Sequence, residues 1–156
     1  MHLDRTDFDI LMQLQKNGRM SNKELAAAIK VAPSTCLLRV QRLTEAGALR
    51  GYHAEVDPSI LGIGIQAISS VRLNNHAKVS FPKLQEELLR VPEVVAVYLM
   101  AGSQDLLIHI VVKDVLQLRE TLSKLVASQP NIANVETSLV LDQARKAVWP
   151  CYAEDL

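Results

Sequence analysis

The feature that most constrains this chain is a pair of short helices joined by a tight turn, predicted over residues 21–30 and 33–46. The first of them opens with Ser21-Asn22-Lys23-Glu24, in which the Ser21 hydroxyl and the Glu24 carboxylate can satisfy the amides that a first helical turn leaves free. The second opens with Pro33, whose fixed φ suits the first position of a helix. Two helices with this spacing form a helix-turn-helix.

Flanking segments extend this pair into a winged helix-turn-helix. Residues 4–17 carry apolar side chains at helical spacing, and Asn17-Gly18 is the expected end of that helix. Residues 49–56 alternate in polarity, which predicts a short strand that serves as the wing. We therefore expect a DNA-binding domain over residues 1–60.

Positive charge gathers in this part of a neutral chain. The whole sequence holds 17 Lys and Arg against 17 Asp and Glu, whereas residues 19–50 hold six basic residues and two acidic ones. A local basic patch suits one anionic surface such as DNA, where phosphates supply much of the affinity and base edges in the major groove supply the specificity. The pattern alone also fits an ordinary three-helix bundle with a solvated basic face. The predicted DNA-binding residues are Arg19, Lys23, Ser34, Thr35, Leu38, Arg39, Arg42 and Arg50.

Residues 61–156 predict a second domain, which makes the fold class α+β. The expected order is βαββαβ, the order of a ferredoxin-like sheet with two helices on one face. Expected strands span residues 64–73, 94–101, 106–113 and 132–141, the first of them broken at 74–76, and expected helices span 80–91 and 115–128.

The other face of that sheet would be apolar, and its expected members are Val95, Val97, Leu99, Leu107, His109 and Val111. Because a contiguous patch of this kind is too apolar to leave in water, we expect a second copy of the chain to cover it. A two-fold homodimer would also place two recognition helices on a palindromic operator, with half-sites about one helical turn apart or a multiple of it.

Several classes of protein are disfavoured by what the sequence lacks. Cys36 and Cys151 lie far apart and the four histidines are scattered, which argues against a disulfide framework and a metal site. No apolar run approaches the ~20 residues of a membrane span, and the chain opens without a secretory leader. No nucleotide-binding or hydrolase motif is present. We therefore expect a cytoplasmic protein without a cofactor, a membrane partner or catalytic residues.

An ordered set of short motifs covers essentially the whole chain: Leu3-Asp4-Arg5-Thr6-Asp7, Asn17-Gly18-Arg19, Lys23-Glu24-Leu25-Ala26, Pro33-Ser34-Thr35-Cys36-Leu37, Arg39-Val40-Gln41-Arg42-Leu43, Gly51-Tyr52-His53-Ala54-Glu55-Val56-Asp57-Pro58 and Leu61-Gly62. Together they resemble the Lrp/AsnC family of bacterial and archaeal transcription regulators. The resemblance implies a sequence-specific DNA-binding protein, a homodimer that assembles to a tetramer or octamer, and a second domain that pairs subunits and senses a small effector, most often an amino acid.

One loop carries the effector prediction. Gly102-Ser103-Gln104-Asp105 resembles the Gly-x-x-Asp loop with which this family holds amino-acid effectors. A Gly-containing hairpin offers backbone amides to a carboxylate, and Asp105 could receive an ammonium group. The alternative is that Gly102 only makes the turn and Asp105 fixes it. The predicted effector-binding residues are Met100, Gly102, Ser103, Gln104 and Asp105, together with Glu136 and Thr137 of the last strand from a neighbouring dimer.

Three positions depart from the pattern of the family. Ala32 stands where a Ser usually caps the recognition helix, Leu38 stands where a basic residue is common, and Gln104 stands where an aromatic residue is common. The competing function is an enzyme, because haem-pathway decarboxylases share the two-domain arrangement. Such an enzyme would leave the basic patch of the second helix without an evident use.

Overall fold

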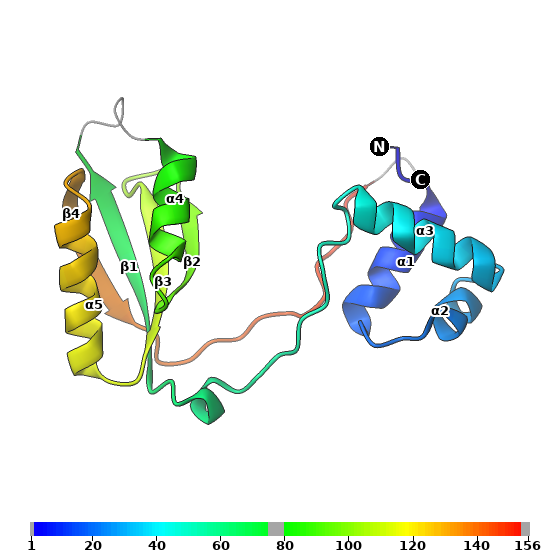
Figure 1. Ribbon diagram of the computed structural model, residues 1–156, viewed down its shortest axis with the longest axis horizontal. Helices are drawn as coiled ribbons and strands as arrows, with labels where there is room; N and C mark the ends of the chain where they lie inside the picture. Colours follow the sequence, from blue (N-terminus) through cyan, green and yellow to red (C-terminus); the bar gives the residue numbers. More distant parts are fainter. Residues whose placement is uncertain (1, 75–79, 154–156) are drawn as a thin grey trace. The chain divides into compact units, whose positions relative to one another are not determined.

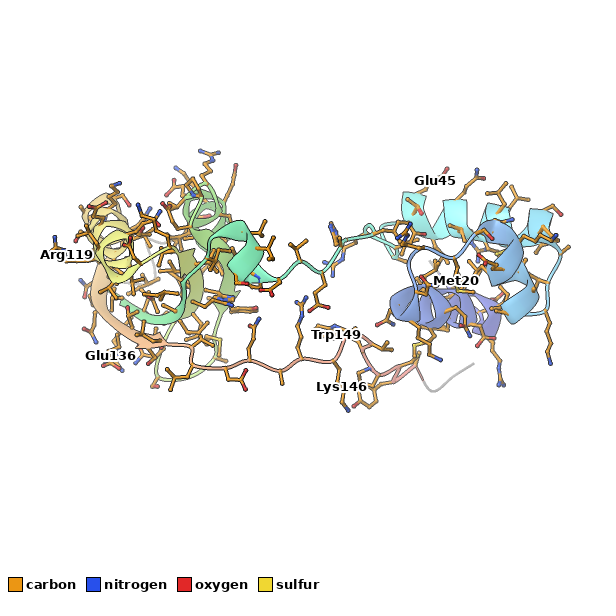
Figure 2. The ribbon with its side chains drawn as sticks, turned by 90° about the horizontal axis from the view of Figure 1, so that it is seen from below. Met20, Glu45, Arg119, Glu136, Lys146 and Trp149 are labelled. Carbon is orange, nitrogen blue, oxygen red and sulfur yellow. The ribbon has the colours of Figure 1, made fainter. Side chains whose placement is uncertain are left out.

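The computed structural model describes residues 2–74 and 80–153 of the chain (Figure 1). Its internal contacts define two compact units. One holds the residues up to Glu55 together with those from Ala144 onward, and the other holds Val56–Gln143. The C-terminal segment contacts the first unit through a hydrogen bond of 2.8 Å from Trp149 N to Gln15 Oε1 (Figure 2). The domain boundary that we expect from the sequence, between residues 60 and 61, is not tested by this division into units and stays a prediction.

Three helices form the first unit: α1 (Arg5–Lys16), α2 (Asn22–Ala28) and α3 (Pro33–Glu45). Both α1 and α2 begin with a capping box, in which a side chain and a backbone amide at each helix start bond reciprocally. The predicted helix-turn-helix is confirmed with small changes at the helix ends. Its core consists of Ile10, Leu14, Leu25, Ala26, Cys36 and Leu43, and burial raises the pKa of the Cys36 thiol.

The start of α3 lacks a side-chain cap. Ala32 occupies the N-cap position and makes no side-chain hydrogen bond to the helix. The Asn22 amide of α2 instead donates to the Pro33 carbonyl at 2.8 Å, which ties the two helices together at this point. Lys30, in the turn between them, has a φ of 58°, a left-handed conformation that is uncommon for a residue with a side chain. Two backbone hydrogen bonds close the turn around Lys30 in the pattern of a Schellman motif, from the Val31 amide to the Ala26 carbonyl at 3.0 Å and from the Lys30 amide to the Ala27 carbonyl at 3.3 Å.

Two details of the first unit differ from the sequence prediction. Residue 18 does not end α1 through a left-handed glycine. It instead gives room to an aromatic ring, because a Cβ on Gly18 would lie 2.9 Å from Tyr52 Cδ1. The predicted strand over residues 49–56 is wrong. A strand requires a hydrogen-bonded neighbour, and the sheet in the described part of the chain consists only of strands of the second unit.

The second unit is a four-stranded antiparallel sheet covered by two helices on one face (Figure 1). In chain order it contains the 3₁₀ helix η1 (Pro58–Leu61), β1 (Ile65–Leu73), α4 (Phe81–Leu89), β2 (Val94–Leu99), β3 (Leu106–Val112), α5 (Val115–Ser128) and β4 (Ile132–Leu139). The strand order β2-β3-β1-β4 confirms the predicted βαββαβ fold. Of the residues expected to break the first strand, 75 and 76 lie outside the described part of the chain.

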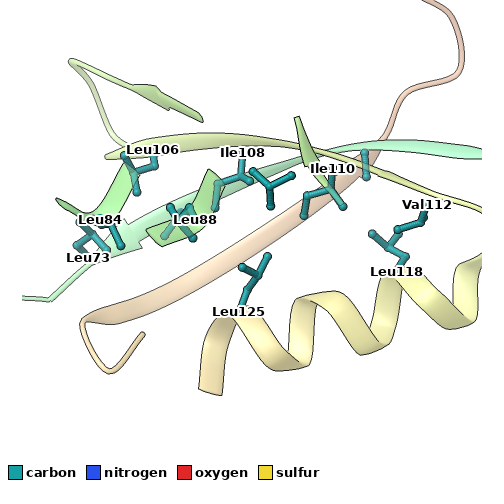
Figure 3. Close-up of a cluster of buried hydrophobic side chains, with 12 residues drawn as sticks. Leu73, Leu84, Leu88, Leu106, Ile108, Ile110, Val112, Leu118 and Leu125 are labelled. Atoms are coloured by element: carbon teal, nitrogen blue, oxygen red, sulfur yellow. The ribbon is translucent and has the colours of Figure 1, made fainter. Parts of the chain in front are cut away.

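Alternation along β3 positions the core. Leu106, Ile108, Ile110 and Val112 are all buried and point toward the helices, where they meet Leu118 and Leu125 of α5 and Leu84 and Leu88 of α4 (Figure 3). Gly64 lets β1 start close to the end of β3, since a Cβ there would lie 2.3 Å from the Lys113 carbonyl oxygen. This core fixes the sheet on which the candidate effector loop stands.

The face of the sheet opposite the helices differs from the prediction at β2. A β-bulge between Val94 and Ala96 shifts the alternation of that strand by one residue. Val97 therefore packs against the core. Tyr98 pairs with Leu107 and Ala96 pairs with His109. Leu99 pairs with the buried Leu106 and so lies on the helix side as well. The expected apolar face exists, but Val97 and Leu99 do not belong to it.

Candidate DNA-binding surface and effector loop

The outward side of α3 carries a single stripe of side chains. Cys36 and Leu43 face the core of the unit. An α-helix has 3.6 residues per turn, so residues spaced four, three and four positions apart lie along one side of it. The four residues with this spacing on the side opposite Cys36 and Leu43 are all exposed. In Figure 2, Glu45, the last of them, projects from the side of α3 that is turned away from α1. The members of this outward stripe are Ser34, Leu38, Gln41 and Glu45.

Arg39 lies on the flank of α3 and is bound to α1. Its Nη1 atom is 2.7 Å from both carboxylate oxygens of Asp4 and 2.9 Å from Asp7 Oδ1. These contacts raise the pKa of Arg39, and the hydrogen bond from its guanidinium lowers the pKa of Asp4. Most of the Arg39 side chain is covered, with 25% exposed. The positive charge of Arg39 is therefore neutralised by carboxylates of its own unit.

Arg42 carries the second guanidinium on this flank, and its side chain is more exposed than that of Arg39. Its Nη2 atom bonds Asp7 Oδ2 at 2.5 Å, while half of its side chain stays exposed. Asp7 itself has no exposed surface and receives both arginines. Two carboxylates at the start of α1, one from its N-cap residue and one from its first turn, thus face two guanidinium groups of α3. These ion pairs hold the two helices together and neutralise part of the basic patch.

The remaining DNA-binding candidates lie free of this network. Ser34 and Thr35 are exposed in the first turn of α3, and Leu38 is 66% exposed one turn later. Lys23 is exposed in the first turn of α2, and Arg19 and Arg50 are exposed in the segments after α1 and α3. The sequence prediction omitted Gln41, although its spacing of seven residues from Ser34 places both on one side of a helix.

The candidate effector loop joins β2 to β3 and is fastened to the end of β1. The Leu73 amide donates to Asp105 Oδ2 at 2.7 Å, and the Asp105 amide donates to the Val71 carbonyl at 2.9 Å. The Arg72 guanidinium donates to the Ser103 carbonyl through Nε at 3.2 Å and Nη2 at 2.9 Å. The Met100 amide closes the loop on the Asp105 carbonyl at 2.9 Å. Asp105 therefore fixes the loop, as the alternative interpretation expects.

Two features of this loop have no explanation within the chain. Gly102 does not adopt a left-handed conformation, and a Cβ added there would meet nothing within 4 Å. In the described part of the chain, the buried Gln104 Oε1 has no hydrogen-bond partner. Open space beside a glycine and an orphaned acceptor are features that a bound molecule or a second subunit would use.

Glu136 and Thr137 point to opposite faces of the sheet, because neighbours on a strand alternate. Thr137 pairs with the buried Ser69, and their hydroxyl oxygens lie 2.9 Å apart on the helix side. Glu136 pairs with Ser70, which pairs with Leu107 on its other side, near the end of the loop. A pocket on either face of β4 can receive only one of these two side chains from a given subunit.

Other kinds of site find no support in the described residues. No group of three or more His, Cys, Asp and Glu side chains lies close enough together there to hold a metal ion. No helix among residues 2–74 and 80–153 has the length and apolar character that crossing a membrane requires.

Known proteins resemble the chain over nearly its full length. The HTH-type transcriptional regulator AldR of Mycolicibacterium smegmatis is 34% identical over 145 residues, which cover 93% of this chain and 85% of that protein. The leucine-responsive regulatory protein of Escherichia coli K12 is 30% identical over 145 residues, covering 93% and 88%. The crystal structure of MtbAldR superposes with a TM-score of 0.80 at 30% identity, over 95% of this chain and 100% of that one.

Two family models match successive parts of the chain. A winged helix-turn-helix DNA-binding model matches residues 3–50, and the model of the Lrp/AsnC ligand binding domain matches residues 66–150. The fold and these matches define a DNA-binding transcriptional regulator with an effector-binding domain. The relatives are regulators and not enzymes, so the decarboxylase alternative falls away. The chain belongs to the Lrp/AsnC family, as its motifs predicted.

Proposed function

We propose that the protein binds a palindromic operator through α3 and changes its affinity or assembly when an amino acid binds near the loop of residues 100–105. The observation that carries the DNA-binding part is the exposed outward stripe of α3, which lies on the second helix of a helix-turn-helix. That helix is the one that such motifs insert into the major groove.

The proposed contacts divide by chemistry. Ser34, Thr35 and Leu38 meet base edges, since hydroxyl and apolar groups at the start of a recognition helix reach them. Arg19, Lys23 and Arg50 meet phosphates. Arg42 keeps its bond to Asp7 and turns its exposed donors to a phosphate, while Arg39 holds α1 against α3.

A gel-shift experiment with the DNA upstream of the protein's own gene tests this assignment. Sequence-specific binding that weakens steeply with salt is the expected result, because each phosphate contact releases counterions. Arg42→Ala should weaken operator binding and reduce the salt dependence by about one phosphate contact while leaving the oligomer intact. Unchanged affinity would remove Arg42 from the interface.

The amino-acid proposal rests on the loop and on one neighbour. The crystal structure of the transcriptional regulator NMB0573/L-Met complex from Neisseria meningitidis superposes with a TM-score of 0.79 at 28% identity, over 93% of this chain and 94% of that one. In this chain, the open space at Gly102 and the orphaned Gln104 oxygen favour a ligand at the loop of residues 100–105. Met100, Ser103 and Asp105 complete the proposed site, and Glu136 or Thr137 of another subunit would close it.

Thermal-shift screening of the proteinogenic amino acids tests the effector. We expect one of them to raise the Tm of the wild-type protein and to lose this effect in Asp105→Ala. Glu120→Ala is the matched control, because it removes an exposed carboxylate of α5 that lies outside the proposed site. The same screen with no stabilising amino acid would overturn the effector proposal and leave the DNA-binding assignment standing.

We further propose that the open sheet face pairs two subunits, that dimers assemble to a tetramer or octamer, and that the protein works in the cytoplasm, where its DNA lies. Tyr98 is 53% exposed on that face and pairs with Leu107. Exposed apolar side chains that lie together in this way are typical of subunit interfaces. Sedimentation analysis of Leu107→Lys should show a smaller assembly than the wild type. An unchanged mass would place the interface elsewhere.

A further inference from the structure

We infer that Leu38 and Gln41 read adjacent A·T base pairs, so that the centre of each half-site is selected by an aliphatic side chain and a carboxamide rather than by an arginine. This inference rests on the proposed operator binding and adds the identity of the bases. Its starting point is the outward stripe of α3, which holds a hydroxyl, an isobutyl group, a carboxamide and a carboxylate and no cation.

The absence of a cation from the stripe has a structural cause. Arginine bound bidentately to guanine is the commonest specific contact in the major groove. The two arginines of α3 lie on its flank, however, where Asp4 and Asp7 hold their guanidinium groups against α1. Arg42 can turn its remaining donors to a phosphate, but to direct its whole guanidinium at a guanine it would have to break its ion pair with a carboxylate that has no exposed surface. Asp7 would then keep Arg39 and the Asp4 amide but lose one of its two guanidinium partners while fully buried, which is costly.

The side chains that remain are suited to A·T pairs. A glutamine amide donates to N7 and accepts from the N6 amino group of adenine, and an apolar side chain contacts the C5 methyl group of thymine. Leu38 keeps 66% of its surface exposed, so most of this apolar side chain is left uncovered by its own unit. A methyl group in the groove would supply that cover.

The spacing of the two residues supports adjacent base pairs. Three residues along an α-helix rise about 4.5 Å, which is close to the step of about 3.4 Å between successive base pairs. Glu45 lies two turns beyond Leu38 on the same side, where its carboxylate repels phosphates and keeps that end of α3 out of the groove. The readout is therefore confined to the first two and a half turns of the helix.

Selection from a randomised duplex library with the full-length protein tests the inference directly. We expect adjacent A·T pairs in each half-site of the enriched wild-type sequence. Gln41→Glu is expected to replace A by C at one of these positions, because a carboxylate accepts from the cytosine N4 amino group and repels adenine N7. The exchange keeps the size of the side chain and its exposed position, so it leaves the fold unchanged.

Base analogues in the selected duplex assign each residue to its base pair. Uracil in place of thymine removes only the C5 methyl group, and we expect about a fourfold loss of wild-type affinity at one position. Leu38→Ala should bind more weakly and no longer respond to uracil. In the same way, 7-deazaadenine should cost the wild type about fivefold or more and should not affect Gln41→Ala. Leu37→Ala is the matched control, because that exposed leucine lies off the stripe and its loss should keep both responses.

The outcomes separate this inference from the proposed function. An enriched site with G·C pairs at these positions, or one whose sequence and analogue responses are the same in the variants, overturns the inference and leaves operator binding standing. If Arg42→Ala instead changes the selected base, Arg42 reads the DNA and the inference is wrong. If the wild-type protein enriches no sequence at all, the proposed operator binding fails and the inference fails with it.

Discussion

Asp7 of α1 and Arg42 of α3 form an ion pair in which the carboxylate has no exposed surface and half of the guanidinium side chain is exposed. The Asp7 carboxylate also accepts a hydrogen bond from Arg39 at 2.9 Å. The backbone amide of Asp7 donates to Asp4 Oδ1 at 3.0 Å. One buried side chain thus joins the start of the first helix to the middle of the recognition helix. The orientation of the DNA-binding surface depends on it.

Replacing Asp7 should therefore destabilise the first unit. We expect Asp7→Ala to lower the free energy of unfolding by about 2 kcal/mol, since hydrogen bonds to charged groups contribute about that much and both arginines lose a partner. Urea unfolding at neutral pH measures the change. Asp9→Ala is the control, because Asp9 is exposed in the same helix and should matter by less than about 0.5 kcal/mol. Equal effects of the two substitutions would contradict the role given to Asp7.

A serine at position 32 should stabilise the recognition helix. Ala32 has the extended backbone of an N-cap residue, with φ −65° and ψ 142°, and offers no side-chain acceptor to the first turn. Ala32→Ser should raise the free energy of unfolding by about 1 kcal/mol, which is the usual contribution of such a cap. Thermal or urea denaturation shows whether it does. Ala46→Ser, at the other end of α3, should bring no such gain.

Acid should weaken the first unit through Asp4. The hydrogen bond from Arg39 is the largest cause that lowers the pKa of Asp4 below its ordinary 3.8. A carboxyl group with a lowered pKa stabilises the folded state above its unfolded value, and this stabilisation is lost as the pH falls from about 4 through the folded pKa. Asp4→Asn should lack this part of the acid loss, while asparagine still caps α1. The measurement is the Tm of the wild type and of Asp4→Asn as a function of pH, down to about pH 3. If the Tm of Asp4→Asn falls as steeply as that of the wild type, the Asp4–Arg39 pair does not cause the acid loss.

The fold could be predicted from the sequence because its local patterns agree with each other. Capping residues at Ser21 and Glu24, proline at position 33 and alternation along residues 106–112 each specify one kind of element. The errors arose where the outcome depends on contacts between distant residues. The bulge at Val94 and the missing strand at residues 49–56 reflect strand pairing, which no local pattern shows.

The candidate site could be predicted in part for the same reason. Exposure of Ser34, Thr35 and Leu38 follows from the helical repeat, and so would that of Gln41. The partners of Arg39 and Arg42 lie more than thirty residues away in the chain, in a helix whose position only the fold defines. Residue type identified the arginines as DNA contacts, whereas the folded unit binds them to carboxylates.

The last prediction concerns His109, on the open face of the sheet, whose Nε2 atom lies 3.0 Å from Gln66 Oε1. Burial lowers the pKa of His109 below its ordinary 6.5, because it disfavours the charged ring. The neutral histidine thus stabilises the folded state fully above about pH 6.5, and this contribution is lost as the pH falls from there toward the folded pKa. The Tm of the wild type should fall between about pH 7 and pH 5 by more than that of His109→Gln, which cannot titrate. His53→Gln removes an exposed histidine of the first unit and should leave the wild-type profile unchanged. A profile in His109→Gln that is as steep as the wild type's would show that other groups cause the acid loss.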